Sequence, residues 1–284
     1  MKSLSDTYTL SNDLPIPCIG FGTAGGEPGS GVPESAILAA IELGYRHIDT
    51  AQSYGNEDSV GRAVRHCGLA REDIFVTSKL VGHEHGYEKT HAAFAGTMER
   101  MGLDYLDLFL IHWPNPIAYR DRWQAVNAET WKAFEELYAA GRIRAIGVSN
   151  FRPHHLDALL KSANVAPMVN QIRLCPGDTQ DDVVDYCRAR GILLSAYSPL
   201  GAGGIFAVPE MQALAQKYEK SIAQICIRWS LQQGFLPLPK SATPERIKAN
   251  ADVFDFALEA SDVELIAGLK GCVGYSMDPD EATW

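Results

Sequence analysis

The sequence predicts a single α/β domain over residues 1–284, folded as a (β/α)8 TIM barrel. Three observations predict this class: eight short apolar runs recur along the chain, amphipathic helical stretches lie between them, and no low-complexity linker interrupts the 284 residues. Barrels of roughly 250 residues fold as one unit, so the length does not require two domains. An open doubly wound sheet is the alternative, but eight strand–helix units without a visible second domain favour the barrel.

The expected strands are almost continuously apolar, as strands buried on both faces are. They cover residues 18–22, 45–49, 74–79, 106–112, 144–149, 168–171, 192–197 and 235–240. Because helical stretches separate them, the strands are expected to be parallel. The opening segment 8–16, with Asn12-Asp13 between two short runs, reads as a β-hairpin that closes the bottom of the barrel.

The expected helices carry apolar residues at helical spacing, for example at 60, 63, 64 and 67. Proline at a first helical position, a Ser-x-x-Glu capping box and glycine after a last turn mark helix boundaries. These signals occur at Pro33 and Pro244, at Ser261 with Glu264, and at Gly141 and Gly191.

Composition excludes several classes of function. The chain has 25 Lys and Arg against 35 Asp and Glu, a formal net charge of −10, so neither a nucleic-acid surface nor an anionic-membrane surface is expected. The longest apolar stretches, such as 106–111, fall far short of the roughly 20 residues that span a bilayer. The first residues have no apolar signal-peptide core. We therefore expect a soluble, cytoplasmic protein.

Cysteine and histidine spacing does not indicate a metal site. The six cysteines are scattered without a C-x-x-C pair, and those at 67 and 187 fall on apolar helix faces, as reduced core residues do. His83 and His85 are the best candidate ligands. No third ligand is nearby and glycines flank the pair, which favours a solvated loop.

Residues 20–25 read G-x-G-x-x-G after an expected strand, and Asp49 ends the next strand, as in a dinucleotide-binding Rossmann unit. In that unit the motif opens a helix directly, so that the helix N-terminus meets a pyrophosphate. Here residues 26–33 intervene. We therefore interpret the segment as a glycine-rich loop over the barrel mouth.

Polar residues gather at the carboxyl ends of the expected strands, which surround one pocket in a barrel. In chain order they are Asp49, Lys79, His112, Ser149-Asn150, Gln171, Tyr197-Ser198 and Lys240-Ser241. A barrel needs some polar residues at its rim, so any one of them alone is better explained as structural. Seven polar ends on eight strands are hard to explain in that way.

Three segments resemble the aldo-keto reductases, a family of barrel-fold, nicotinamide-dependent carbonyl reductases. They are residues 44–51 followed by Tyr54-Gly55-Asn56-Glu57, residues 101–108, and residues 239–247. The resemblance runs from about Leu14 to Asp262. Chain size and compact loops are similar to those of the shorter microbial members, including 2,5-diketo-D-gluconate reductases.

The resemblance implies a catalytic tetrad of Asp49, Tyr54, Lys79 and His112, and the chemistry explains each residue type. Reduction delivers hydride to a carbonyl carbon while the oxygen must receive a proton, which Tyr54 can donate. A free phenol has a pKa of about 10, and the Lys79 cation is expected to lower it. Asp49 would hold Lys79, and His112 would orient the carbonyl oxygen. Hydride and proton have different donors, so no metal is required.

The same resemblance implies NADPH/NADP+ as cofactor. Tyr197 would stack on the nicotinamide, Ser149, Asn150 and Gln171 would fix its carboxamide, and 198–201 would run along the pyrophosphate. Lys240, Ser241 and Arg246 match a clamp on the 2′-phosphate, which points to NADPH over NADH. The complete expected set is Gly22, Thr23, Asp49, Ser149, Asn150, Gln171, Tyr197, Ser198, Leu200, Gly201, Lys240, Ser241, Thr243, Arg246 and Asn250.

The chain departs from the family pattern in two places. Ala24, Gly25 and Gly26 stand where a bulky aromatic residue is frequent, and Ala249 replaces a carboxylate that often lies beside the adenine. The first change is expected to alter the shape of the substrate pocket and the second the adenine contacts. Neither falls on the tetrad.

The expected activity is NADPH-dependent reduction of aldehydes or ketones to alcohols by a monomer. Small dicarbonyls and keto sugars suit the short loops, whereas aromatic aldehydes suit the Trp and Tyr content. Tyr54, His112 and Trp113 are the expected substrate contacts, and loop or tail residues that could line the pocket are Tyr119, Trp123, Tyr275, Met277 and Trp284. Two other functions fit the same motifs: a cofactor-holding regulatory subunit, as in potassium-channel β subunits, and a structural protein, as in some lens crystallins.

Overall fold

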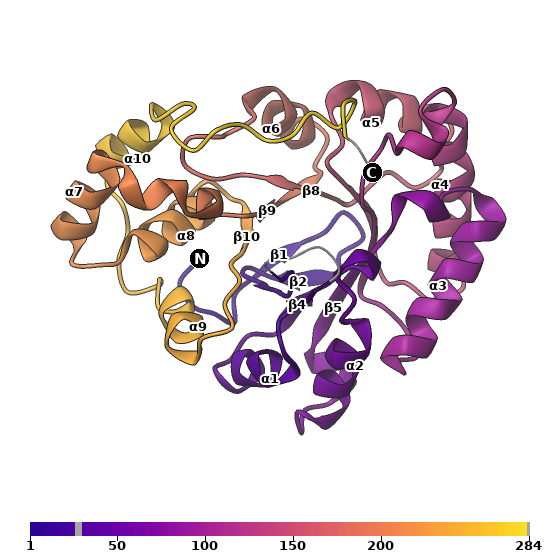
Figure 1. Cartoon of the computed structure of the whole chain (residues 1–284), viewed down its shortest axis with the longest axis horizontal. Coiled ribbons are helices and arrows are strands. Elements are labelled where there is room, and N and C mark those ends of the chain that lie inside the picture. The colour runs from indigo at the N-terminus through magenta and orange to yellow at the C-terminus, as the bar shows by residue number, and fades with distance from the viewer. Residues whose placement is uncertain (26–29, 283–284) are drawn as a thin grey trace.

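The computed structural model describes residues 1–25 and 30–282. At its centre, eight parallel strands form one sheet in which each strand pairs with its neighbour in sequence (Figure 1). The strands of this sheet are β3 (Phe21–Gly22), β4 (His47–Asp49), β5 (Phe75–Leu80), β6 (Leu108–Ile111), β7 (Ile146–Ser149), β8 (Val169–Arg173), β9 (Leu193–Tyr197) and β10 (Leu236–Leu238). All eight expected strands are present, with differences at their ends only.

The first and last strands close the sheet into a barrel through glycine. The backbone N–H groups of Gly20 and Gly22 donate to the carbonyl oxygens of Pro237 and Pro239, both at 3.0 Å. A Cβ atom on Gly20 would lie only 2.5 Å from Leu238 Cδ2 and 2.6 Å from His47 Nδ1, so a larger residue would have to displace these two buried side chains. Part of the G-x-G-x-x-G segment therefore serves barrel closure.

Helices surround the barrel (Figure 1), and apolar side chains from strands and helices form the core between them. They are α1 (Glu34–Glu42), α2 (Glu57–His66), α3 (Tyr87–Met101), α4 (Trp123–Ala139), α5 (Pro153–Leu160), α6 (Asp181–Arg188), α7 (Pro209–Tyr218), α8 (Ile222–Gln232), α9 (Pro244–Ala251) and α10 (Ala260–Ala267). Short 3-10 helices in the loops are η1 (Gln52–Tyr54), η2 (Arg71–Asp73), η3 (Gly82–Glu84), η4 (Ile117–Tyr119) and η5 (Gly201–Ala207). Packing is direct: the ring of Phe109 on β6 lies 5.5 Å from Phe94 on α3 and 4.9 Å from Phe134 on α4.

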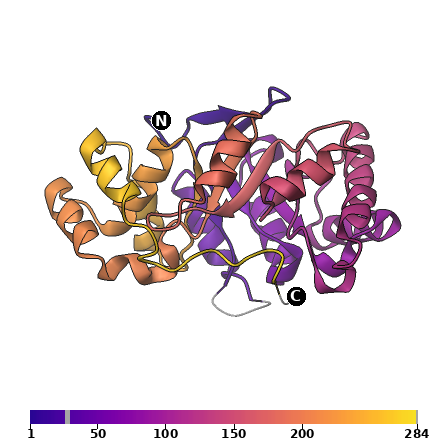
Figure 2. The same ribbon diagram turned by 90° about the horizontal axis from the view of Figure 1, so that it is seen from above.

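An N-terminal hairpin covers one end of the barrel, and the C-terminal tail crosses the other end (Figure 2). Strands β1 (Thr7–Thr9) and β2 (Pro15–Pro17) pair antiparallel, and Asp13 in the turn has φ 64°. The predicted (β/α)8 barrel with a hairpin at its bottom is confirmed. The open doubly wound sheet, and with it the Rossmann alternative, is wrong.

Most of the expected helix signals lie where helices begin or end. Pro244 is the first residue of α9, and Pro33 precedes the first residue of α1. Gly141 and Gly191 follow α4 and α6 with φ 69° and 66°, a backbone conformation that suits glycine.

The expected capping box at Ser261 is wrong, because α10 already begins at Ala260 and Glu259 precedes it without a side-chain cap. A capping box does occur at α8, where Ser221 Oγ accepts a hydrogen bond from the backbone N–H of Gln224.

Backbone hydrogen bonds join the two described ends of the glycine-rich segment, and the next helix among the described residues is α1, which begins at Glu34. The backbone N–H of Gly25 donates to Ser30 O at 2.7 Å, and that of Val32 donates to Thr23 O at 2.9 Å. Residues 26–29, which belong to the expected loop over the mouth, lie outside the described residues. In the part of the chain that the structure describes, no helix is long and apolar enough to cross a membrane.

Candidate active site

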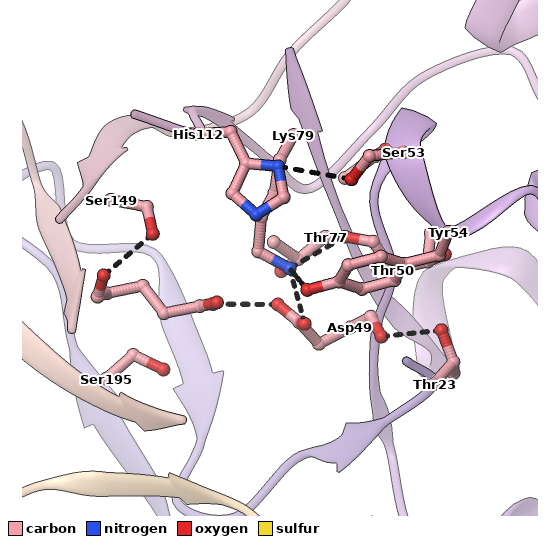
Figure 3. A network of polar contacts seen from close by, with 12 residues as sticks. Thr23, Asp49, Thr50, Ser53, Tyr54, Thr77, Lys79, His112, Ser149 and Ser195 are labelled. Atoms are coloured by element: carbon pink, nitrogen blue, oxygen red, sulfur yellow. Dashed lines mark hydrogen bonds and ion pairs between the residues drawn. The ribbon is translucent and has the colours of Figure 1, made fainter. Parts of the chain in front are cut away.

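Four side chains expected to act together meet at the carboxyl ends of three neighbouring strands (Figure 3). Asp49 ends β4, Lys79 lies on β5, and His112 directly follows β6. Tyr54 comes from η1 in the loop after β4, which turns its side chain back over the barrel. The structure thus brings together all four residues of the expected tetrad.

Lys79 occupies the centre of this group. Its Nζ donates to Asp49 Oδ1 at 2.6 Å, to the backbone oxygen of Thr50 at 2.8 Å and to Tyr54 Oη at 3.3 Å. The side chains of Lys79 and Asp49 are 0% and 4% exposed. An ammonium has three N–H donors, so all of them have partners here. The buried charge is therefore both compensated and fixed in position.

Burial and charge act in opposite directions on the two proton-holding groups. Burial would lower the pKa of Lys79, but Asp49 and Tyr54 together outweigh it and raise that pKa, so the amine stays charged. Burial also raises the pKa of Tyr54, and Lys79 opposes this rise. The expectation that the lysine lowers the phenol pKa therefore holds for the contribution of Lys79 but not for the net direction, because desolvation is larger.

His112 is a neutral imidazole in this environment. Burial, followed by the nearby charge of Lys79, holds its pKa well below the usual value. Nδ1 lies 3.5 Å from Ser53 Oγ, and the ring meets that of Tyr54 edge-on with centroids 5.9 Å apart. In Figure 3, Nε2 faces the side where Lys79 and Tyr54 lie. A neutral ring with its proton on Nε2 would direct a hydrogen-bond donor toward the space above the phenol.

The loop that carries Tyr54 is held by polar side chains on both sides. Gln52 accepts a hydrogen bond from the backbone N–H of Val81 at 2.9 Å and donates to Thr97 Oγ1 at 2.9 Å. Asn56 accepts from Thr50 Oγ1 at 2.8 Å and donates to the backbone oxygen of Thr23 at 3.2 Å. These bonds tie the tyrosine loop to β5, to α3 and to the glycine-rich segment.

The expected nicotinamide-binding residues form a continuous hydrogen-bonded chain beside the tetrad. Tyr197 donates to Asn150 Oδ1 at 2.9 Å, and Asn150 Nδ2 donates to the backbone oxygen of His112 at 2.9 Å and to Ser149 Oγ at 3.0 Å. Ser149 in turn donates to the backbone oxygen of Gln171 at 2.8 Å. Asn150 has φ 62°, a conformation uncommon outside glycine that keeps its amide in this network.

A second group of expected cofactor residues lies at the rim. Lys240 and Arg246 are exposed, and the structure's described part contains no ion pair of either with an acidic residue. Ser241 Oγ accepts a hydrogen bond from the backbone N–H of Thr243 at 3.0 Å, just before α9. Asn250 is buried in the last turns of α9. Two cations and a helix N-terminus therefore face solvent together.

The expected pyrophosphate segment follows β9 with unusual backbone angles. Ser198 and Gly201 have φ 49° and 54°, and the N–H of Gly201 donates to Ser198 O at 2.9 Å. A Cβ atom on Gly201 would lie 2.9 Å from the side chain of Val273. Thr23, which directly follows β3, donates from both its N–H and its Oγ1 to the backbone oxygen of Asp49, at 3.0 and 2.9 Å.

This site geometry agrees with a sequence comparison. The model of the Aldo/keto reductase family matches residues 18–270. The chain belongs to the aldo/keto reductase family.

Individual relatives of this aldo/keto reductase cover almost its full length. A glyoxal reductase of Bacillus subtilis (strain 168) is 46% identical over 279 residues, which are 98% of each chain. The crystal structure of MGS-M4, an aldo-keto reductase enzyme from a Medee basin deep-sea metagenome library, has a TM-score of 0.90 at 40% identity and covers 98% of this chain and 100% of its own. That of a Bombyx mori aldo-keto reductase in complex with NADP has a TM-score of 0.85 at 33% identity and covers 94% of both.

Possible metal ligands of this aldo/keto reductase differ from the expected ones. The side chain of His83 is 71% exposed as expected of a solvated loop, whereas His85 is buried against Tyr119, which the sequence did not predict. Among the described residues, one group could offer three ligand atoms: His154, His155 and Asp280.

Hydrogen bonding argues against a metal in this group. His155 Nδ1 accepts from the backbone N–H of Arg152 at 3.2 Å, so a neutral ring carries its proton on Nε2, which lies 3.0 Å from Asp280 Oδ1. The ring nitrogen that faces Asp280 is thus a donor and not a ligand. We interpret the group as a docking contact for the C-terminal tail.

Several residues considered for the substrate pocket have packing roles. Tyr119 is buried and accepts a hydrogen bond from Lys89, and Trp123 packs edge-on against His155 with centroids 4.8 Å apart. Tyr275 and Met277 are exposed tail residues, Trp113 is partly buried, and Trp284 lies outside the described residues.

Two polar groups of the site were not predicted from the sequence: the backbone oxygen of Thr50 and the hydroxyl of Ser53. The sequence offers no signal for them beyond their nearness to Tyr54.

Proposed function

We propose that this aldo/keto reductase uses NADPH to reduce small aldehydes and ketones to alcohols, with Tyr54 as the proton donor. The observation that carries the proposal is the contact of 3.3 Å between Lys79 Nζ and Tyr54 Oη inside a buried, charge-compensated group. The family membership and the NADP complex of a relative support the cofactor. We also propose that residues 1–284 act as one catalytic domain.

The residues at the mouth fit a nicotinamide dinucleotide phosphate. Ser149 and Asn150 offer polar groups at the end of β7, Gln171 offers its amide from within β8, and Tyr197 at the end of β9 supplies an aromatic face. Lys240 and Arg246 are exposed cations with no ion pair among the described residues, so they can bind a phosphate without breaking one. When bound, the reduced cofactor supplies the hydride. The clamp is the basis for preferring NADPH over NADH.

Proton transfer is the step that this chain performs itself. His112 holds the carbonyl oxygen, and Tyr54 donates its proton as negative charge develops there. Lys79 stabilises the resulting phenolate, and Asp49 keeps Lys79 charged. Because burial raises the pKa of Tyr54, the phenol holds its proton at neutral pH, and reduction should slow as the pH rises through that pKa.

We propose small dicarbonyls as the first substrates to examine. The named activity of the relative that is 46% identical is glyoxal reduction, and the compact loops of this chain suit small compounds. Keto sugars and aromatic aldehydes are the alternatives, and each would be distinguished by kcat/KM.

The experiment follows the loss of reduced-nicotinamide absorbance with glyoxal, a keto sugar and an aromatic aldehyde, in the native protein and in Tyr54→Phe. We expect kcat to fall by about 100-fold or more in the variant, because the ring remains but the acid is lost. NADPH binding, measured by quenching of tryptophan fluorescence, should be retained. Near-native turnover by Tyr54→Phe would remove Tyr54 from the donor role. NADPH binding without turnover of any substrate would favour the regulatory alternative.

A further inference from the structure

The side-chain amide of Gln171 makes a contact across the barrel that the cofactor role does not require. Its Nε2 lies 2.8 Å from Asp49 Oδ2. Gln171 lies on β8 and Asp49 ends β4, which are four positions apart in the order of the eight strands. In a closed barrel of eight strands these two strands are opposite one another. The bond therefore joins two walls of the barrel directly beneath the tetrad.

This bond completes the partners of the Asp49 carboxylate. Oδ1 accepts from Lys79 Nζ at 2.6 Å, Oδ2 accepts from Gln171, and the backbone oxygen of the same residue is held by Thr23. Asp49 and Gln171 are 3% and 2% exposed, so bulk water does not reach the pair freely. Because each carboxylate oxygen has its own hydrogen-bond donor, the carboxylate cannot rotate without breaking a buried hydrogen bond.

The carboxylate also fixes which way the amide of Gln171 points. An ionised carboxylate only accepts hydrogen bonds, so the amide nitrogen must face Asp49 and the amide oxygen must face away. Within the described residues, no hydrogen bond is accepted by Gln171 Oε1. That oxygen is therefore available to accept from the carboxamide NH2 of a nicotinamide, while the nitrogen of the same amide stays on Asp49.

We propose that Gln171 is a positioning residue for the proton donor: by holding Asp49 Oδ2 it keeps Lys79 Nζ against Tyr54, and through its amide oxygen it links the seating of the nicotinamide carboxamide to that arrangement. The anchoring of Asp49 stands on the geometry of this chain alone. The link to the cofactor rests on the proposed function.

The direction of the effect follows from the three bonds of Lys79. Without the amide, Oδ2 would be a buried carboxylate oxygen lacking a donor, and the carboxylate would turn both oxygens toward Lys79. The contact with Tyr54, at 3.3 Å, is the longest of the three and yields first. Since that contact opposes the rise of the phenol pKa, its loss raises the pKa further and weakens the acid. His112 and Tyr197 also face Tyr54 and are titratable, but neither of them contacts Asp49.

The test replaces the amide by a side chain of similar length that cannot donate, Gln171→Met. Ser149→Ala is the matched control, because Ser149 is also expected at the carboxamide but contacts Gln171 only at its backbone oxygen, and contacts neither its side-chain amide nor Asp49. Crystal structures of both variants without cofactor give the Nζ–Oη separation. The dissociation constant of NADPH is measured by tryptophan fluorescence, and kcat is measured against pH at saturating NADPH.

In Gln171→Met we expect the Nζ–Oη separation to lengthen by about 0.5 Å or more, beyond hydrogen-bond range. The alkaline limb of kcat should move up by about half a pH unit or more, and kcat should fall roughly tenfold. Ser149→Ala should weaken NADPH binding but leave both the separation and the alkaline limb at their native values. Should Gln171→Met fail to fold, Gln171→Glu places an acceptor against an acceptor and should lengthen the same separation.

An unchanged Nζ–Oη separation together with an unchanged alkaline limb would overturn the proposal, even if NADPH bound more weakly. Gln171 would then serve the cofactor alone, and the proposed function would stand. If instead the native protein reduced no carbonyl compound, the proposed function would fail, while the structures without cofactor would still decide whether Gln171 anchors Asp49.

Discussion

The barrel mouth holds positive charge in two places that differ in how the charge is compensated. At the centre, Lys79 is fully buried and all three of its N–H groups bond to partners from its own chain. At the rim, Lys240 and Arg246 are exposed, and neither forms an ion pair with any residue that the structure describes. The central cation is fixed before any ligand arrives, whereas the rim cations are free to pair with one.

The difference shows what each region is built to do. A buried ammonium is stable only with close partners, because desolvation of an unpaired charge costs several kcal/mol. Those partners also fix its position, which proton transfer requires. An exposed cation on a long side chain contributes little to folding and keeps its charge for an anion. We therefore expect changes at the centre to affect kcat and stability, and changes at the rim to affect cofactor affinity.

Lys79→Met should have the largest effect. It removes the cation that stabilises the phenolate of Tyr54 and leaves the buried Asp49 carboxylate without its ion-pair partner. We expect kcat to fall by about 1,000-fold or more and the free energy of unfolding to fall by about 3 kcal/mol at neutral pH. Steady-state kinetics and urea denaturation measure the two effects.

Tyr54→Phe is the control for the stability effect, since it also loses the acid but keeps the Asp49–Lys79 pair. Its free energy of unfolding should stay within about 1 kcal/mol of native. Equal destabilisation of both variants would show that the ion pair is not what separates them.

Arg246→Ala should weaken binding of the 2′-phosphate at the rim and leave the buried group around Lys79 unchanged. A charge-assisted hydrogen bond to a phosphate contributes about 1.5–3 kcal/mol, so kcat/KM for NADPH should fall roughly 10- to 100-fold. In the same variant, kcat/KM for NADH should stay at its native value, because NADH lacks the 2′-phosphate. Lys248→Ala on the same helix is the matched control, because it removes an exposed cation two residues away. Equal kcat/KM values for the two cofactors in the native protein would count against the clamp.

Much of the barrel could be predicted from the sequence because its signals are local. Apolar runs identify strands buried on both faces, and the polar residues that end them, such as Asp49 and Lys79, must meet because the carboxyl ends of barrel strands surround one pocket. The capping box predicted at Ser261 failed because α10 begins one residue earlier, after Glu259, whose backbone N–H donates to Tyr218 Oη of α7 and not to a local cap. Local signals therefore located the elements better than their ends.

Contacts across the barrel could not be predicted from the sequence. Gln171 and Asp49 are 122 residues apart, and only the closed barrel places their side chains in contact. The burial of His85 depends in the same way on the packing of Tyr119 against it. The net pKa direction of Tyr54 was mispredicted because the sequence shows the neighbouring cation but not the extent of desolvation.

Ionic strength should affect the exposed rim more than the buried centre, with smaller effects than the substitutions above. Salt screens exposed charges over about 10 Å at 0.1 M but affects a buried pair much less. Raising the salt concentration from about 0.02 to 0.3 M should therefore increase KM for NADPH several-fold and change kcat by less than about twofold. Arg246→Ala should show a weaker dependence of KM on salt. A kcat that fell in parallel with the affinity would show that the central pair is open to solvent.

Asp280→Asn should have the smallest effect and tests a third, intermediate environment. Asp280 joins the C-terminal tail to the loop after β6 and to helix α5 by accepting hydrogen bonds from Asn115 at 2.9 Å and His155 at 3.0 Å. Burial lowers the pKa of His155 to about 4, so at neutral pH the ring is neutral and donates to a charged carboxylate. The asparagine oxygen can still accept from His155, but the charge is lost. We expect KM for the carbonyl substrate to rise by about two- to threefold, and the tail to be cleaved sooner by a nonspecific protease. The alkaline limb of kcat should not move, because the tail does not touch Lys79 or Tyr54; a shift of that limb would mean that the tail and the centre share one electrostatic unit.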